Sequence, residues 1–476
     1  MIGVILEKEL TEYRRDGRVI GVASLIGLLV LGSLMTGWST HTDQQRQARE
    51  AQRQDQATFL KQGEKPPHSA AHFGRVAYKP VPALAVFDPG AAPYLGQAIW
   101  LEAHRQDPAM FRPAEDSPEL RRLADLSVAG VLRLLVPLLV CLVAYGAFAA
   151  ERERGTLRHI VSMGARLDSL FAGKVAAVAL VGIAVSSVAI CTSLGVALMS
   201  PMSTSAHDTL IRAVGLVLGY AVYSVAFAAV ALSISVRARS AASALMILLS
   251  VWTVSVVVLP RFAASAAEQL YATPDSSAFW NEASEAIRVT RPDRKSEAYR
   301  SIERGVLSRA LGREIGEEEA AAIDVNRIGL SLEISELLGA RVYAYAYREL
   351  YRSYENQQRV RRLISILSPT IVLQHLSSAL AGTDIAAHRH FALAAEEQRK
   401  QILRSMNEDM MLSGAGQGFD YVASPELWRK IPDFDYELPD ASIALRSAAP
   451  DFFSLALWSA AALWIASRTA QRQRVL

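Results

Sequence analysis

The sequence predicts an all-α polytopic membrane protein with six transmembrane helices, an N-terminal interfacial helix and a large, mainly helical extracytoplasmic domain. Hydrophobic residues make up 51% of the chain and are concentrated in blocks that contain almost no charge. A helix needs roughly 20 apolar residues to cross a hydrocarbon core of about 30 Å, where every backbone N–H and C=O must be paired internally. Basic residues gather in the short segments between the blocks, as membrane topology requires.

The apolar blocks place six spans along the chain. The sixth is the shortest and is flanked by Asp451 and Arg468. The first span is preceded by several glutamates, and no small-residue cleavage site follows Trp38, so we interpret it as a retained anchor and not a signal peptide. The predicted spans are residues 19–38, 128–150, 175–199, 210–236, 241–260 and 451–467.

Lysine and arginine in short loops mark the cytoplasmic side of a membrane protein. Six alternating spans put every basic cluster on one side, so we expect both termini to be cytoplasmic in a bacterial inner membrane. Residues 1–18, 151–174 and 468–476 then lie inside, whereas 39–127 and 261–450 lie outside. The clusters contain Lys8, Arg14, Arg15, Arg18, Arg152, Arg154, Arg158, Arg166, Lys174, Arg237, Arg239, Arg468, Arg472 and Arg474.

Residues 1–18 are predicted to form an interfacial helix. Apolar side chains recur at helical spacing along one face, and charged side chains take the other. The alternative is a solvated tail. The apolar face consists of Ile2, Ile5, Leu6, Leu10 and Tyr13.

The outer segments have different local patterns. Residues 43–56 are polar and predicted helical, and residues 66–93 are interrupted by proline and glycine, which favours strands or loops. Residues 296–311, 318–367 and 384–412 are predicted helices, with Thr383 as the N-cap of the last. Within the second of these, one face carries Tyr343, Tyr347, Tyr351 and Tyr354, which we expect to pack against a neighbouring helix and not to line a substrate path.

The composition excludes several functions. The net charge of +3, with basic and acidic residues evenly mixed, gives no basis for nucleic-acid binding. No phosphate-binding loop or metalloprotease, hydrolase or Cys-x-x-Cys motif occurs, so we expect the chain to be non-catalytic and to hold no cofactor. Cys141 and Cys191 fall inside predicted spans and form no disulfide framework.

Histidine and methionine clusters raise the question of a metal site. His388 and His390 are two residues apart, so on a helix they point to different faces and do not chelate one ion. The nearby Met406, Met410 and Met411 fit an ordinary core. His68 and His72 have the i, i+4 spacing of helical ligands but follow Pro66 and Pro67. We therefore expect no metal site.

Two arginines lie within predicted spans. Arg133 is near the outer end of the second span and Arg212 is at the start of the fourth. Because a charge in lipid is expensive, we expect both side chains to extend to the membrane interface.

A charged motif directly follows the second predicted span. It reads Glu151-Arg152-Glu153-Arg154-Gly155-Thr156-Leu157. A short charged loop closing two long helices is a stiff lever; Gly155 permits a sharp turn, and Thr156 can cap the next helix. The alternative is an ordinary basic loop with a helix cap. The candidate site residues are Glu151, Glu153, Arg154, Gly155, Thr156, Leu157 and Arg158.

This E-x-E-x-G-T-L pattern resembles the cytoplasmic coupling element of type-2 ABC-transporter permeases. Residues 73–80 with 87–90, and 367–369 through 381–391, further resemble a subgroup with large extracytoplasmic domains, labelled as linked to multi-copper enzyme maturation. The resemblance implies that residues 151–174 dock on a cytoplasmic ABC ATPase, which holds the ATP and Mg. It also implies a second permease chain, identical or paralogous, and export of a substrate.

Three functional hypotheses follow. The first is an ATP-driven permease. The second is a complex that does mechanical or maturation work on extracytoplasmic proteins without translocating a substrate. The third, a membrane enzyme or receptor without an ATPase, is disfavoured by the absence of catalytic motifs. The sequence identifies no substrate.

Overall fold

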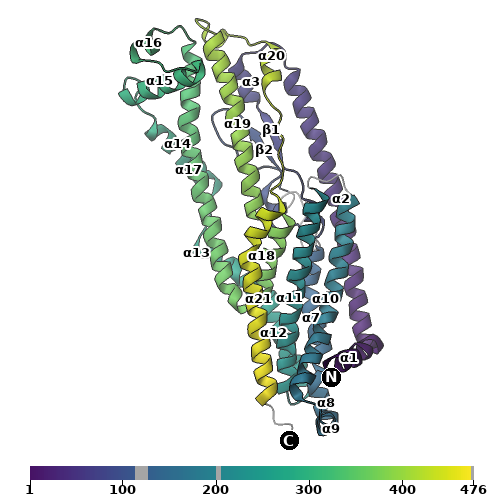
Figure 1. Cartoon of the computed structure of the whole chain (residues 1–476). Helices are drawn as coiled ribbons and strands as arrows, with labels where there is room; N and C mark the ends of the chain where they lie inside the picture. The colour runs from purple at the N-terminus through teal and green to yellow at the C-terminus, as the bar shows by residue number, and fades with distance from the viewer. Residues whose placement is uncertain (113–126, 200–204, 473–476) are drawn as a thin grey trace.

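The computed structural model describes residues 1–112, 127–199 and 205–472, and it is an elongated, 79% helical molecule (Figure 1). Within these described ranges, six helices are long and apolar enough to cross a membrane, which confirms the all-α polytopic prediction. Both termini lie at one end, which we call the proximal end, and the opposite end forms a distal domain (Figure 1). Residues 113–126 of the first outer segment and Arg474 of the tail lie outside the described residues.

The apolar helices form a bundle at the proximal end. A short α1 (Ile2–Arg15) precedes them and ends at Asp16, whose carboxylate accepts a hydrogen bond from the Arg18 N–H and so caps the next helix. The bundle helices are α2 (Gly17–Leu60), α7 (Val128–Ala144) with α8 (Gly146–Glu153), α10 (Leu167–Met199), α11 (Ala206–Arg237), α12 (Ala241–Trp252) continuing through the π-helical Thr253–Val258 into α13 (Leu259–Leu270), and α21 (Ala441–Arg472).

Helix α11 is the centre of the bundle and packs against α7, α10, α18 and α21. The Tyr223 side chain is fully buried, and its hydroxyl lies 3.1 Å from the Arg133 carbonyl of α7 and 3.0 Å from the Thr370 hydroxyl of α18. Helix α18 (Pro369–Ala381) falls within the predicted outer segment, yet its apolar side chains join the bundle core. The bundle core therefore includes one helix that is too short to span a bilayer.

The distal domain contains most of the remaining elements. A two-stranded antiparallel sheet pairs Arg75 with Leu101, and long helices pack beside it (Figure 1). The elements are α3 (Pro67–Phe73), β1 (Arg75–Tyr78), η1 (Ala83–Val86), α4 (Ala92–Leu95), β2 (Ala98–Leu101), α14 (Ser276–Thr290), α15 (Glu297–Leu311), α16 (Glu317–Ala322), α17 (Arg327–Ile364), η3 (Ser365–Leu367), α19 (Ile385–Ser413), η4 (Gly418–Asp420) and α20 (Pro425–Lys430).

Two expectations about the distal helices are wrong. The helix expected over residues 318–367 is interrupted at residues 323–326, because the side-chain amide oxygen Oδ1 of Asn326 accepts from the backbone N–H groups of Ile328 and Gly329 and starts α17 there. The N-cap of α19 is Asp384 and not Thr383. The Thr383 hydroxyl instead donates to the Asp88 carbonyl in a neighbouring loop.

The tyrosine face of α17 packs as expected, in part. Tyr343 and Tyr347 contact Trp280 and Phe279 of α14, with ring centroids 6.0 and 5.1 Å apart. Tyr347 also lines a cavity of about 110 Å³ together with Tyr351, Tyr354 and His388. The expectation that the methionines of α19 belong to an ordinary core is confirmed, since all three are buried: Met406, Met410 and Met411.

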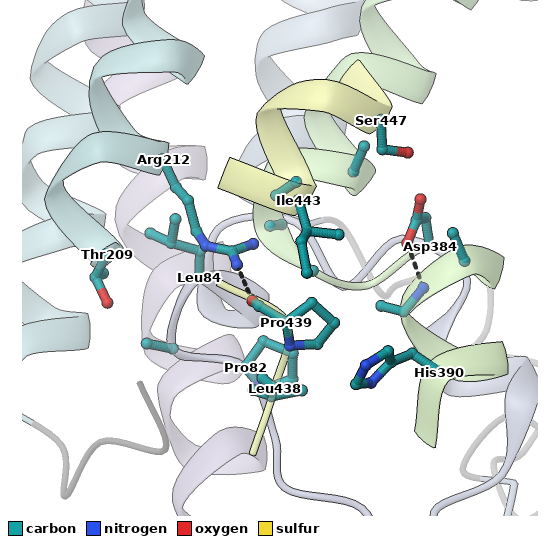
Figure 2. A pocket seen from close by; sticks show the side chains of 17 residues that line it. Pro82, Leu84, Thr209, Arg212, Asp384, His390, Leu438, Pro439, Ile443 and Ser447 are labelled. Carbon is teal, nitrogen blue, oxygen red and sulfur yellow. Dashed lines mark hydrogen bonds between the residues drawn. The ribbon is translucent and has the colours of Figure 1, made fainter. Parts of the chain in front are cut away.

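Both arginines that were expected to extend to the membrane interface have protein partners. The Arg133 guanidinium lies 3.5 Å from the buried Asp88 carboxylate. Arg212 is buried; its Nε donates to Asp208 at 2.8 Å, and its terminal nitrogens donate to the Leu380 and Pro439 carbonyls. A cavity of about 130 Å³ lies beside Arg212 (Figure 2). The Arg133–Asp88 contact and the Arg212–Pro439 hydrogen bond join bundle helices to the segments that precede α4 and α21.

A close approach of two helices in the distal domain gives a stability prediction. A Cβ on Gly329 of α17 would lie 2.7 Å from the Met411 backbone nitrogen of α19. We expect Gly329→Ala to lower the free energy of unfolding by about 2 kcal/mol, and with it the melting temperature, because the backbone atoms of the two helices must separate. Gly339→Ala on the same helix is the control, since nothing lies within 4 Å of its Cβ. Equal melting temperatures for the two variants would contradict this packing.

Candidate functional site

Helix α1 lies against the proximal end of the bundle (Figure 1). Ile5 and Tyr13 pack against the bundle core, whereas Ile2 and Val4 are exposed to 47% and 72%. The predicted apolar face is therefore divided between contact with α10 and an exposed apolar edge. Such an edge on a helix at the end of a membrane bundle can enter the lipid interface.

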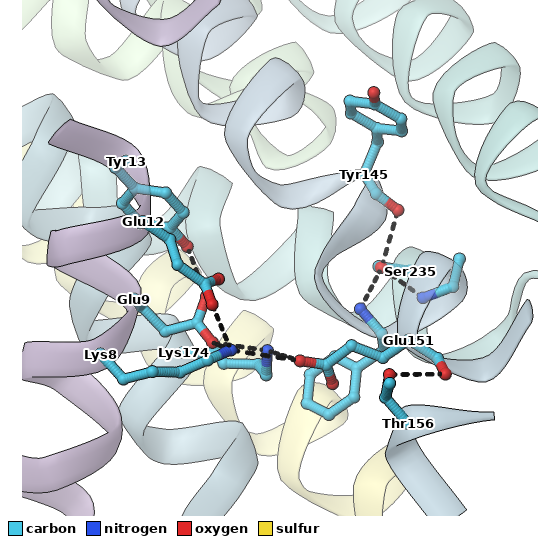
Figure 3. Close-up of polar contacts among 11 residues, drawn as sticks. Lys8, Glu9, Glu12, Tyr13, Tyr145, Glu151, Thr156, Lys174 and Ser235 are labelled. Carbon is cyan, nitrogen blue, oxygen red and sulfur yellow. Dashed lines mark hydrogen bonds and ion pairs between the residues drawn. The ribbon is translucent and has the colours of Figure 1, made fainter. Parts of the chain in front are cut away.

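A buried charge cluster holds α1 to the motif of residues 151–158 (Figure 3). The Lys174 ammonium of α10 lies 2.7 Å from Glu9 of α1 and 2.8 Å from Glu151 of α8. Its side chain is only 2% exposed, and it also lies 5.3 Å from the Phe148 ring centre. One cation thus joins three segments that are far apart in the sequence.

A second lysine completes the cluster from the solvent side. Lys8 lies 3.1 Å from both Glu9 and Glu12 and 3.6 Å from Glu151, and its side chain is 45% exposed. Burial alone would raise the pKa of Glu9, but the ammonium groups of Lys174 and Lys8 outweigh it and hold that pKa below its ordinary value. The Glu9 carboxylate is accordingly ionised in the folded protein at neutral pH.

Helix α8 is also fixed to the end of α11. The Ser235 hydroxyl donates to the Tyr145 carbonyl at 2.9 Å and accepts from the Phe148 N–H at 3.1 Å, where α7 passes into α8 (Figure 3). Arg152 donates to the Val236 and Ala238 carbonyls at 2.5 and 2.7 Å. A cation is well placed at these carbonyls, because the C-terminus of a helix carries partial negative charge.

The turn after α8 depends on Gly155. Its φ of 74° lies in the left-handed region that glycine adopts without strain, and α9 (Thr156–Ser162) begins directly after it. The expectation that Thr156 caps α9 is wrong: its hydroxyl donates to the Glu151 carbonyl at 3.1 Å and so satisfies the preceding helix. Leu157 is buried and anchors α9 to the bundle core.

The seven candidate residues therefore separate into inward and outward groups. Glu151 and Leu157 face the bundle, and Gly155 and Thr156 shape the turn. The side chains exposed at this surface are Glu153, Arg154, Arg158 and the neighbouring His159. The arrangement offers a small charged surface on a rigid helix–turn–helix and contains no constellation suited to covalent chemistry.

Sequence reasoning missed the residues that hold this element in place. Glu9 appeared only as one of several N-terminal acids, Lys174 only as a basic loop residue, and Ser235 not at all. A lysine at the start of an apolar helix was the available signal, because a cation there needs a buried partner. Its two partners are 165 and 23 residues away, which spacing alone does not reveal.

The model of a family described as ABC-2 family transporter protein matches residues 4–466. The chain belongs to this family. An ABC-2 protein is a multi-pass membrane transport subunit and the permease component of an ABC transporter, and it is generally non-catalytic. Membership of the subgroup linked to multi-copper enzyme maturation stays a prediction. No curated protein matches the chain.

The charge cluster of this ABC-2 protein predicts unequal roles for its two lysines. Lys174→Met leaves Glu9 and Glu151 buried without their main cation, and we expect it to lower the free energy of unfolding by about 3 kcal/mol. Lys8→Met should lower the free energy of unfolding by less than about 1 kcal/mol, because that side chain is half-exposed. Melting temperatures of the purified variants test this. Equal losses would show that Lys174 is not the central cation.

The same cluster predicts loss of stability in acid. Because the pKa of Glu9 is lower in the folded than in the unfolded protein, its stabilisation is complete above the unfolded value of 4.5 and is lost as the pH falls through the lowered pKa. The melting temperature should therefore decrease when the pH is lowered below about 4.5. The Glu9→Gln variant should have a lower melting temperature than the wild type at neutral pH, and its melting temperature should decrease less on acidification. A wild-type melting temperature that stays constant to pH 3 would contradict the cluster.

Proposed function

We propose that this ABC-2 permease docks on cytoplasmic ABC ATPase subunits through α8 and α9, and that ATP-driven closure moves the bundle to export a substrate. One observation supports the coupling role above the others: exposed Glu153, Arg154 and Arg158 project from an element whose base is locked to the bundle by buried ion pairs. A force applied to these side chains reaches the helices without first deforming a flexible loop.

The contacts suggest a route for this force. Glu151 passes it through Lys174 to α10 and α1, and Arg152 passes it to the end of α11. Helix α11 crosses the bundle, and at its other end Arg212 binds the Pro439 carbonyl, just before α21 begins. A tilt of α11 would therefore move both the bundle and the distal domain.

The proposed orientation puts the proximal end in the cytoplasm of a bacterial cell, in the inner membrane. The basic residues of α1, α8 and the loop before α12 all lie near that end, in agreement with the positive-inside rule. The ATPase would then meet α8 and α9 directly, with ATP and Mg bound only by that partner.

We also propose a second permease chain, identical or paralogous. Helices α12 and α13 expose a band of apolar side chains along their length, including Met246, Val254, Phe262 and Leu270. Lipid can cover such a band, and so can a second permease. The π-helical segment at Thr253–Val258 lies in the middle of this band, where a local change of helix winding alters the packing of both halves.

The alternative function is ATP-driven mechanical or maturation work on extracytoplasmic proteins without translocation. Its support is the length of α2, whose 44 residues extend about 66 Å at 1.5 Å per residue. This is about twice the hydrocarbon thickness. A single rigid helix thus runs from the proximal end into the distal domain, and movement in the bundle would reach the outside through it.

Co-purification with the candidate ATPase tests the coupling surface. We expect wild-type protein to bind the ATPase and stimulate ATP hydrolysis in membranes, and Glu153→Ala and Arg158→Glu to lower that stimulation at least about tenfold, since desolvated interface charges are worth over 1 kcal/mol. Glu318→Ala, an exposed change in the distal domain, is the matched control and should behave as wild type.

The outcomes are distinguishable because these side chains are exposed and their loss should leave the melting temperature unchanged. Stable variants that no longer stimulate the ATPase would support docking at α8 and α9. Full stimulation by both variants would move the docking surface elsewhere on the chain. Failure of the wild-type protein to bind the ATPase would remove the coupling proposal itself.

A further inference from the structure

The distal domain brings together three histidines that play no part in the coupling surface. His68 and His72 are one turn apart on α3, and His104 follows β2. The Nε2 atoms of His68 and His72 lie 3.2 Å apart, and one ring nitrogen of each of the three histidines lies within 4.8 Å of the others. The ring centroids are 4.6 to 5.3 Å apart.

We propose that His68, His72 and His104 form a binding site for a divalent transition-metal ion of the zinc and copper class. Two nitrogens bound to one tetrahedral zinc ion at about 2.05 Å lie about 3.3 Å apart. The 3.2 Å separation of the His68 and His72 Nε2 atoms already matches this value. One ring nitrogen of His104 lies within 4.8 Å of a ring nitrogen of each of the other two, and a small rotation of this exposed side chain would bring it to a ligand distance.

The local backbone supports the site. Pro67 occupies the first turn of α3, where its missing N–H costs nothing, and the helix that follows places His68 and His72 on one face. From the sequence alone no metal site is expected here, because a helix directly after Pro66 and Pro67 is not assured and His104 is far from the pair along the chain. The interval of 32 residues between His72 and His104 is closed by the antiparallel pairing of β1 with β2.

His104 itself has an unusual conformation. Its φ of 71° is in the left-handed region, which a residue other than glycine adopts only when its surroundings require it. Its backbone N–H donates to the Glu336 carboxylate at 3.4 Å, which ties this loop to α17. The conformation places the imidazole beside the other two, with ring centroids 5.3 Å from His68 and 5.0 Å from His72.

The donor set selects the class of ion. Imidazole nitrogens bind zinc and copper, whereas calcium and magnesium prefer oxygen ligands. The His68 ring is partly covered by Phe419, with 5.5 Å between the two ring centroids, whereas His72 and His104 are exposed. Three protein ligands on an open surface leave a fourth position for water or for a ligand atom from another molecule.

A hydrogen bond between His68 and His72 is the competing explanation for their short separation, since one ring can donate and the other accept. A hydrogen-bonded pair does not require His104, so substituting His104 would leave the metal affinity of such a pair unchanged. The role of His104 therefore separates the two explanations.

Metal titration of the purified, metal-stripped full chain tests the site, with Zn²⁺ measured by calorimetry and Co²⁺ by its visible absorption. We expect one ion per chain and a tetrahedral Co²⁺ spectrum, with no response to Mg²⁺ or Ca²⁺. His104→Ala and His72→Gln should each weaken Zn²⁺ binding at least about 100-fold, because each removes one of three ligands. His207→Ala, an exposed histidine at the start of α11, should bind as wild type.

Melting temperatures in the presence of a chelator show whether each variant is folded, and His104→Asn, which tolerates the left-handed φ, replaces His104→Ala if that variant is unstable. Loss of binding in the folded His72→Gln and His104 variants, with retention in His207→Ala, supports the site. Wild-type affinity in folded His72→Gln and His104→Ala, or absence of Zn²⁺ binding in the wild type, overturns it. None of these readouts requires the ATPase, so the outcome is independent of the proposed coupling function.

Discussion

The buried ammonium of Lys174 is the constraint on which the proximal end depends. A buried charge is tolerated only when it is paired closely, and Lys174 has its partners on α1 and α8. Both segments must therefore take up fixed positions against α10. Once α8 is held in this way, the left-handed turn at Gly155 determines which charges of the motif face outward. The geometry of the proposed docking surface thus depends on the buried pairing of Lys174 with Glu9 and Glu151.

Buried ionic contacts also hold the opposite end of the bundle. Asp88 receives hydrogen bonds from Ser377 and Gly90 N–H and lies near Arg133, and Arg212 binds carbonyls at the ends of α18 and of the segment before α21. Helix α11 takes part at both ends, through Ser235 and through Arg212. A helix clamped at both ends transmits displacement better than it absorbs it, which supports α11 as the mechanical link between the two regions.

The fold was largely predictable because its main determinant is local. Apolar blocks and basic clusters define six spans and put the termini together, since both depend on residues close in sequence. The site was predictable only in part: the motif of residues 151–158 is contiguous, but Glu9 and Lys174 meet across 165 residues. For the same reason the protein partners of Arg133 and Arg212 and the approach of His104 to α3 were not foreseen. Each depends on which segments tertiary packing brings together.

The dimensions of the molecule bear on what its motion can do. Rigid rotation of α2 by about 5° would displace its far end by about 6 Å over its length of about 66 Å. The same rotation moves the proximal residues beside its pivot very little. An ATPase acting on α8 and α9 would thus drive a larger movement in the distal domain than at the coupling surface. Transport needs only that a path open between the spans, whereas work on an external protein needs displacement outside the membrane. In the proposed mechanism, the long α2 and the clamped α11 would supply that displacement.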